Sequence, residues 1–229
     1  RRVRFRIAQE KYMKNDRVQI VSNRMVYKQS GNRLNVESLL LLVNKSKQPI
    51  DSPILYLNPG LGIVSLTSEG QELAYNREGH VVVMNRKMEC GEELPLRVEY
   101  EGTIDEAICY LELSDEEYHN TQMGVLPFSA DPSGKMPKTR HELYSNGGRF
   151  AHVGNKYTIL LPECLWYLSA VPPVNLQIPS MKDFDFTDYQ LEVEGQEGKA
   201  VISQGCMEKN EKGISYSNAH PLPRLSLCI

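Results

Sequence analysis

The residues best suited to chemistry are the adjacent His141 and Glu142, the only His-Glu pair in the chain. A common class of zinc metallopeptidase uses the motif H-E-x-x-H, in which two histidines on one helix face bind the metal and the glutamate acts as general base. Here Ser145 stands four residues after His141, and the surrounding segment is rich in proline and glycine. The second ligand is therefore missing, and we predict no metal site at this pair.

The other reactive side chains also lack the spacing that catalysis requires. The sequence has no G-x-S-x-G turn to present a nucleophilic serine. The run Asp131–Lys135 lacks the first glycine and the Gly-Lys-Ser/Thr order of a phosphate-binding loop. The remaining histidines stand alone, and no two cysteines form a C-x-x-C pair; they are His80, His119, His152, His220, Cys90, Cys109, Cys164, Cys206 and Cys228. An odd number of cysteines leaves at least one thiol free, and this spacing predicts neither a zinc knuckle nor a disulfide framework.

One aromatic cluster surrounds the only tryptophan of the chain. Trp166 and Tyr167 follow Leu161-Pro162-Glu163 and precede Val171-Pro172-Pro173. A proline-flanked aromatic cluster fits two interpretations, a platform that binds a ligand or a group that packs at the corner of a sheet. The sequence leaves both open.

Charge and composition narrow the classes of function. The chain has 229 residues, 41% of them hydrophobic and 24% charged, which is typical of a globular protein. Its net charge of −3 excludes a wholly basic nucleic-acid binder, and we expect no nucleic-acid partner. Residues 1–17 carry a net charge of +5, which leaves −8 for the rest. We interpret 1–17 as a basic lead-in, which is compatible with a solvated tail, a first strand, a nucleic-acid arm or a segment beside a membrane.

Strand patterns dominate the rest of the chain. Leu94, Leu96, Val98 and Tyr100 alternate with polar residues, which is typical of a strand with one buried face. Residues 34–43 are apolar on both faces, which predicts a central strand. Further strands are expected over 18–27, 63–67, 81–84, 108–113, 157–161, 189–193, 200–203 and 225–229. No stretch predicts a long helix, and the longest apolar run, Leu39–Val43, is far shorter than the ~18 residues of a membrane span.

These patterns predict an all-β fold, a β-sandwich of about ten or more mostly antiparallel strands. Residues 114–150 contain repeated proline, glycine and asparagine with few apolar residues, so we expect a long loop excursion there. We therefore divide the chain into the lead-in 1–17 and a single β-sandwich domain over 18–229.

Several of the predicted strands also carry a family resemblance. A leucine-rich strand over Leu34–Asn44 is followed by Leu55–Leu61 and then by Gly91–Gly102, which has the form G-x-x-x-x-L-x-V-x-Y-x-G. Later come Leu161–Tyr167 and the terminal strand Pro223–Ile229. Together these segments resemble the N-terminal β-domain of M1-family, aminopeptidase N-like zinc peptidases over residues 20–229.

The chain departs from that family's pattern at one point. The family often has a Phe-Pro-Cys-x-Asp-Glu-Pro-like stretch, but here Pro162, Glu163 and Trp166-Tyr167 stand in its place. This variant is more similar to a bacterial subgroup in which an M1-like region is fused behind ABC-type permease membrane segments, which the basic start at Arg1 would suit.

The resemblance implies a non-catalytic module. Zinc, the general base and the substrate-amine motif would belong to a downstream domain beyond Ile229, so this chain is expected to hold no cofactor and no catalytic residue. The implied partners are that downstream domain and, through the preceding segment, a membrane. The implied location is the periplasmic or extracellular face of a bacterial membrane. Glu163, Trp166 and Tyr167 are the candidates for contacts at the interface or the substrate end of the cleft.

Two other hypotheses remain open. The chain could be a stand-alone extracellular recognition or adhesion sandwich that binds peptide or glycan through the excursion, or an enzyme whose site is assembled by the fold. An apolar surface beside Ile229 would favour the module. A polar surface there with an aromatic shelf would favour recognition. A cluster of histidine with aspartate or glutamate in a cleft would favour the enzyme.

Overall fold

The computed structural model describes residues 1–13, 16–111, 113, 150–175 and 183–229. The predicted excursion over 114–150, apart from Phe150, therefore lies outside the described residues, as do His141 and Glu142. Within the described part, none of the helices combines the length and the apolar character that a membrane crossing requires.

The largest element is an eight-stranded sheet. In spatial order its strands are β13 (Cys206–Lys209), β14 (Gly213–Ser217), β11 (Asp188–Glu194), β1 (Gln19–Ser30), β2 (Arg33–Val43), β8 (Glu93–Gly102), β4 (Leu61–Ser68) and β5 (Gln71–Glu72). Every neighbouring pair is antiparallel except β1 and β11, which run parallel with Met25 opposite Leu191. The strand predicted to be central, β2, has β1 on one side and β8 on the other.

Alternation along these strands separates a buried face from a wet face. Val36, Leu40 and Leu42 of β2 are buried and lie opposite Tyr100, Leu96 and Leu94 of β8. The intervening side chains face solvent, where Glu37 pairs with Arg97 at 2.8 Å and Arg33 with Glu101 at 3.2 Å. A strand with a period of two therefore has one face in the core and one in water, as its sequence predicted.

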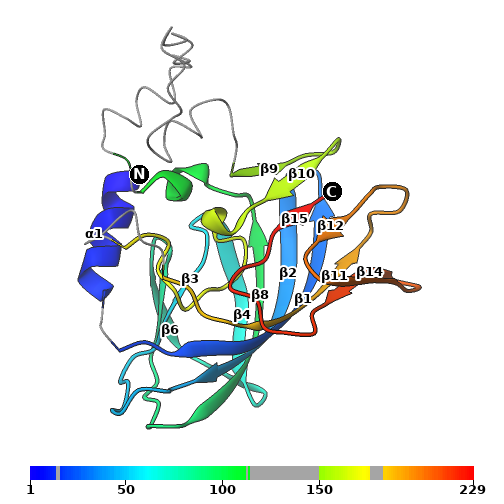
Figure 1. Ribbon diagram of the computed structural model, residues 1–229. Coiled ribbons are helices and arrows are strands. Elements are labelled where there is room, and N and C mark those ends of the chain that lie inside the picture. Colours follow the sequence, from blue (N-terminus) through cyan, green and yellow to red (C-terminus); the bar gives the residue numbers. More distant parts are fainter. Residues whose placement is uncertain (14–15, 112, 114–149, 176–182) are drawn as a thin grey trace, which may run out of the picture.

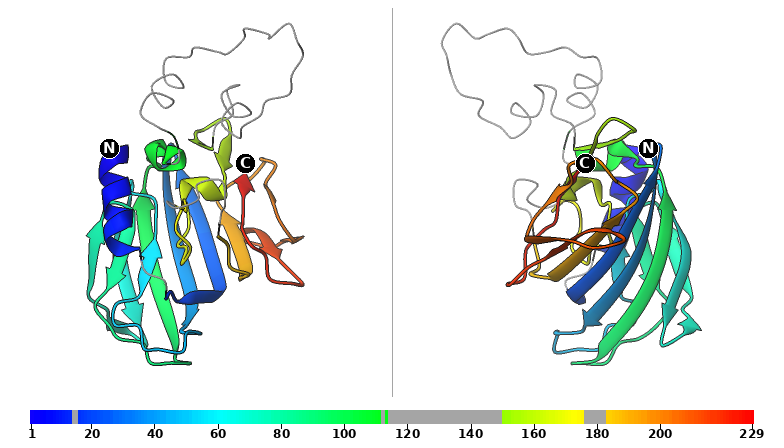
Figure 2. Two further views of the ribbon diagram at one scale, coloured as in Figure 1. Left: turned by 60° about the vertical axis from the view of Figure 1, so that its left-hand side comes forward. Right: turned by 90° about the vertical axis from the view of Figure 1, so that its right-hand side faces the viewer.

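Two smaller sheets lie against the buried face of the large sheet (Figures 1 and 2). One has four strands in the order β12 (Ile202–Ser203), β15 (Leu227–Cys228), β10 (Thr158–Leu160) and β9 (Ala151–Val153). The other has three, in the order β3 (Ile54–Tyr56), β7 (Val81–Met84) and β6 (Tyr75–Glu78). The core between these layers contains Tyr27, Tyr100 and Trp166, all fully buried. The expected all-β, sandwich-like fold is confirmed.

The beginning of the basic lead-in differs from the solvated tail or first strand that we expected. Residues Arg2–Tyr12 form the helix α1, and four of its side chains, Arg2, Phe5, Ala8 and Gln9, are buried. Arg2 Nε donates to the carbonyl oxygen of Tyr110 at 2.9 Å, and Gln9 Nε2 donates to that of Val174 at 2.5 Å. Arg2 and Gln9 make up half of the buried face, so the buried positions are not all apolar. For this reason the hydrophobic pattern of the sequence did not predict a helix.

The prediction of a strand over 108–113 is also wrong. Residues Glu106–Tyr110 form a 3₁₀ helix, η1, which Asp105 caps by accepting a hydrogen bond from the backbone N–H of Ala107 at 3.0 Å. Ile108 and Cys109 are buried side by side, which a strand with one buried face does not allow.

Candidate functional site

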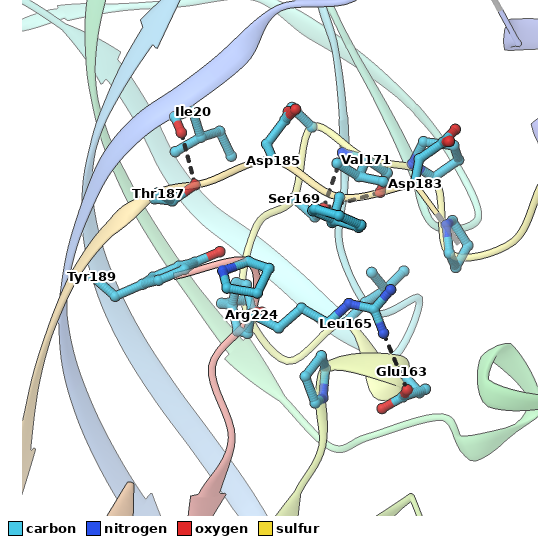
Figure 3. Close-up of a pocket in the computed structure, with 17 residues that line it drawn as sticks. Ile20, Glu163, Leu165, Ser169, Val171, Asp183, Asp185, Thr187, Tyr189 and Arg224 are labelled. Carbon is cyan, nitrogen blue, oxygen red and sulfur yellow. Dashed lines mark hydrogen bonds and ion pairs between the residues drawn. The ribbon is translucent and has the colours of Figure 1, made fainter. Parts of the chain in front are cut away.

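The predicted residues Glu163 and Tyr167 line an open, shallow pocket with a cavity volume of about 60 Å³, room for a small group rather than a whole ligand (Figure 3). The walls come from four parts of the chain, the start of β1, the segment after β10, the approach to β11 and the segment before β15. The lining residues are Ile20, Pro162, Glu163, Leu165, Tyr167, Ser169, Ala170, Val171, Pro172, Pro173, Asp183, Phe184, Asp185, Thr187, Tyr189, Pro223 and Arg224.

A second 3₁₀ helix, η2 (Pro162–Cys164), positions Glu163. Proline suits the start of a helix because its missing N–H needs no partner there, and Leu165 ends the turn at a φ of +52°. The turn is tied to Asn58 by two bonds. Asn58 Nδ2 donates to the carbonyl oxygen of Cys164 at 2.6 Å, and its backbone N–H donates to that of Leu165 at 2.9 Å. The floor of the pocket is thereby fixed to the loop after β3.

The opposite wall is attached to β1. Thr187 Oγ1 donates to the carbonyl oxygen of Ile20 at 2.7 Å, and an ion pair joins Asp185 to Arg17. Across the pocket, Arg224 Nη1 lies 3.5 Å from Glu163 Oε1 (Figure 3). This ion pair joins the wall that precedes β15 to the wall that follows β10.

The pocket offers binding groups and no catalytic pair. Burial raises the pKa of Tyr167 well above its ordinary value, and burial also raises the pKa of Tyr189, so both phenols are neutral at physiological pH. The Ser169 hydroxyl already donates to the carbonyl oxygen of Val171 at 2.9 Å. The lining residues include neither a histidine to activate that serine nor a cysteine. Its walls suit a ligand with an apolar body and a polar group that can reach Arg224 or a carboxylate.

The three predicted site residues have different positions. Glu163 and Tyr167 line the pocket, whereas Trp166 is fully buried behind it and meets the Tyr167 ring edge to face at 5.0 Å between centroids. Trp166 belongs to the core, where its ring also meets that of Tyr27 edge to face, and any influence on a ligand would pass through Tyr167. Sequence reasoning did not find Tyr189 and Arg224, because only the fold brings them beside Tyr167.

Within the described ranges, no group of three or more histidine, cysteine, aspartate or glutamate side chains is arranged to hold a metal. His80 is fully buried, with its ring stacked on Tyr56 and edge-on to Phe5. Neither of its ring nitrogens has a hydrogen-bond partner. Burial and the nearby Arg77 charge lower the pKa of His80 to about 4, so it packs as a neutral aromatic ring.

A second surface feature lies beside Ile229, on the outer face of the four-stranded sheet. Ile202, Cys228, Ile159 and His152 are consecutive cross-strand partners from β12 to β9, and we call them the cross-strand row. The alternate residues on three of these strands, Leu227, Leu160 and Ala151, are fully buried, so the row faces away from the core.

The cross-strand row has three apolar members, of which Ile202 is exposed and Cys228 and Ile159 are partly exposed. Ile202 is 64% exposed, and the exposed ring of Tyr157 stacks on His152 with centroids 4.2 Å apart. Ile229 itself is bound to this sheet by two backbone hydrogen bonds to Thr158, of 2.7 and 2.9 Å. The surface beside Ile229 therefore includes one well-exposed apolar side chain, Ile202, among partly exposed ones.

No family model and no curated protein matches the sequence. Solved structures with a similar fold include M1 zinc peptidases. The M1 zinc metallopeptidase of Deinococcus radiodurans has a TM-score of 0.60 at 13% identity, with 93% of this chain covering 42% of that chain. Aminopeptidase A of Legionella pneumophila has a TM-score of 0.61 at 8% identity, and 95% of this chain covers 22% of it. Yeast LTA4 hydrolase has a TM-score of 0.54 at 10% identity, and 92% of this chain covers 29% of that chain.

The chain therefore spans less than half the length of each of these peptidases. At 8 to 13% identity the likeness is one of fold. That fold resembles the N-terminal domain of M1 aminopeptidases, in agreement with the resemblance of the sequence.

Proposed function

We propose that this chain is a non-catalytic β module that packs on a downstream zinc-peptidase-like domain of the same polypeptide and helps to enclose its cleft. The observation that carries the proposal is the cross-strand row. It presents accessible apolar side chains on the sheet to which Ile229 is bound, next to the point where a following domain would begin. Accessible apolar surface of this kind is typical of an interface.

Two finer parts of the proposal rest on the resemblance and on charge. The parent protein is attached to a bacterial membrane and joined to ABC permease-like segments, with this module on the periplasmic or extracellular side. The +5 charge of residues 1–17 supports a position close to a membrane. Glu163 and Tyr167 contact the substrate end of the cleft from the pocket, since both line it.

The experiment compares this chain with a longer chain that continues past Ile229. Each is assayed for bound zinc and for cleavage of Tyr-Ser-Ala, the peptide described as the substrate bound to the Deinococcus radiodurans enzyme. We expect the short chain to be metal-free and inert and the long chain to bind about one zinc and cleave the peptide. Stoichiometric zinc in the short chain would overturn the proposal. If both chains are inert, the parent is not a working peptidase, and a binding or transport-coupling role takes its place.

The interface itself is tested by the substitution Ile202→Lys in both chains. Its matched control is Leu39→Lys, because Leu39 is also an exposed aliphatic residue but lies on the outer face of the large sheet. In the short chain neither substitution should change thermal stability much. In the long chain, Ile202→Lys should lower the melting temperature and Leu39→Lys should not. Equal behaviour of the two variants in the long chain would rule out the cross-strand row as the interface.

The pocket supports a second candidate function, recognition of a peptide or glycan by a stand-alone sandwich. Its proline and aromatic lining and the Arg224–Glu163 pair are suited to such ligands. This candidate predicts that the short chain binds ligand alone and that Arg224→Met abolishes binding, as measured by calorimetry against peptide and oligosaccharide libraries. The module requires no such binding.

A further inference from the structure

Helix α1 is fixed to the body of the protein by one side only. Phe5 packs on His80, and a Cβ added at Gly79 would lie 3.0 Å from the Phe5 ring, so the fit there is close. Arg2 and Gln9 bind backbone carbonyl groups of Tyr110 and Val174. The orientation of α1 is therefore determined, and the opposite side of the helix is its outer face.

The outer face of α1 combines apolar and basic side chains. Val3 and Ile7, four residues apart, lie next to each other on the helix and are 53% and 55% exposed. At 100° per residue they occupy the middle of the outer face, with Arg4 on one flank and Arg6 and the exposed Glu10 on the other, so the face has a net charge of +1. Neither arginine forms an ion pair with any residue that the structure describes.

Most other cations of the basic N-terminal region are already neutralised or buried. Lys11 Nζ lies 2.6 Å from Glu78 Oε2, Arg17 pairs with Asp185, and Arg2 is buried. Arg4 and Arg6 thus provide free positive charge on a body that is otherwise acidic. A strip with an aliphatic centre and cationic flanks matches the boundary of an anionic bilayer, where aliphatic groups enter below the headgroups and arginines meet the phosphates. A nucleic-acid backbone offers nothing to the aliphatic centre.

We propose that the outer face of α1, formed by Val3, Arg4, Arg6 and Ile7, rests on the surface of an anionic lipid bilayer. This inference rests on the membrane attachment in the proposed function and specifies which surface of the module touches the membrane. It requires no membrane-spanning helix within the chain. The contact is weak by itself, because two aliphatic and two basic side chains form a small interfacial anchor, and it therefore orients a module that the preceding segment holds in place.

The test is co-sedimentation of the 229-residue chain with vesicles of phosphatidylcholine, with and without phosphatidylglycerol. We expect partitioning onto the phosphatidylglycerol vesicles at low salt, a decrease as salt increases, and little partitioning onto pure phosphatidylcholine. The double variant Arg4→Gln/Arg6→Gln should reduce the partition coefficient by roughly fivefold per arginine. Val3→Ser/Ile7→Ser should reduce it by roughly tenfold without changing the salt dependence.

Matched controls lie elsewhere on the surface. Lys45→Gln/Lys47→Gln removes two exposed cations, and Leu39→Ser/Val64→Ser removes two exposed aliphatic groups from the large sheet. Neither should change partitioning, and the circular dichroism and melting temperature of all four variants should match the parent chain. The inference is overturned if the chain ignores phosphatidylglycerol, or if the control variants lose binding as much as the α1 variants do. Zinc binding and peptide cleavage do not enter this assay, so its failure leaves the module proposal standing.

Discussion

Asn58 donates a 2.6 Å hydrogen bond from Nδ2 to the carbonyl oxygen of Cys164, a residue 106 positions away. The same side chain accepts through Oδ1 from the backbone N–H groups of Gly60 and Asp105, each at 2.9 Å. One fully buried amide therefore joins the loop after β3, the cap of η1 and the end of η2. The position of Glu163 in the pocket depends on this junction.

Replacing Asn58 with aspartate should separate its donor role from its acceptor role. A carboxylate keeps the acceptor but places negative charge against the Cys164 carbonyl oxygen in a buried site. We expect Asn58→Asp to lower the free energy of unfolding by roughly 2–4 kcal/mol at neutral pH, as measured by urea denaturation. The control Asn85→Asp, at an exposed position bonded to Asn76, should change it by less than about 0.5 kcal/mol. Equal losses in the two variants would contradict the role of the junction.

Two glycines close to this junction should respond differently to alanine. A Cβ at Gly60 would lie 2.1 Å from the backbone oxygen of Thr103, whereas a Cβ at Gly62 would meet only the Glu101 oxygen at 3.8 Å. Gly60→Ala forces two backbone segments apart, so we expect a loss of more than about 2 kcal/mol or failure to fold. Gly62→Ala should be nearly neutral in the same denaturation assay. A tolerant Gly60 would mean that the two segments do not approach so closely.

His80 should make the stability of the protein depend on pH. Its pKa is about 4 when folded and near 6.5 when unfolded, so between these values the unfolded chain binds the proton more readily. Stability should therefore fall as pH decreases from about 6.5 to about 4, by about 3 kcal/mol in total, and this contribution should level off below pH 4. Melting temperatures measured across this range would show the slope.

The substitution His80→Phe isolates that contribution. It fills the space between Phe5 and Tyr56 with a ring that has no unpaired polar atoms, so we expect equal or higher stability at pH 7 and a flatter profile between pH 6.5 and 4. His220→Gln, at an exposed position, should keep the original slope. An unchanged slope in His80→Phe would assign the pH dependence to other groups.

The single tryptophan should report directly on the packing behind the pocket. Trp166 has no exposed surface in the folded chain. Its fluorescence should therefore be blue-shifted and insensitive to iodide until urea unfolds the chain. A tryptophan placed at the exposed position of Tyr157, in a Trp166→Phe background, should be quenched readily. Strong iodide quenching of native Trp166 would be inconsistent with the packing described above.

The sequence predicted strands of two kinds. Burial alternates along β2 and β8, and their alternating apolar residues are the buried ones, whereas the predicted strand at 81–84 coincides with β7, in which all four residues are buried. It did not predict β13, because all four residues of that edge strand are exposed and no alternation results. It did not predict α1, because arginine and glutamine complete the buried face of the helix.

The candidate site was predictable only where its parts are adjacent in sequence. Glu163 and Tyr167 belong to one short aromatic and proline-rich segment, and composition alone drew attention to it. Arg224, 61 positions after Glu163, belongs to a segment that the sequence identified only as the terminal strand, with nothing to link it to the pocket. The pairing of β15 with β10 and the bridge between Thr187 and Leu222 place it, and such long-range placement leaves no local pattern.

The parallel pairing of β1 with β11 sets the order in which this sheet can be completed. Ser22 lies opposite Asp188, so one edge of β1 has no partner until β11 has left the ribosome. During that interval the nascent chain presents an open strand edge, the kind of surface that pairs with other chains. Closing the sheet is a late step in biogenesis, and a chain released before residue 188 is a substrate for chaperones or proteases rather than a partly finished domain.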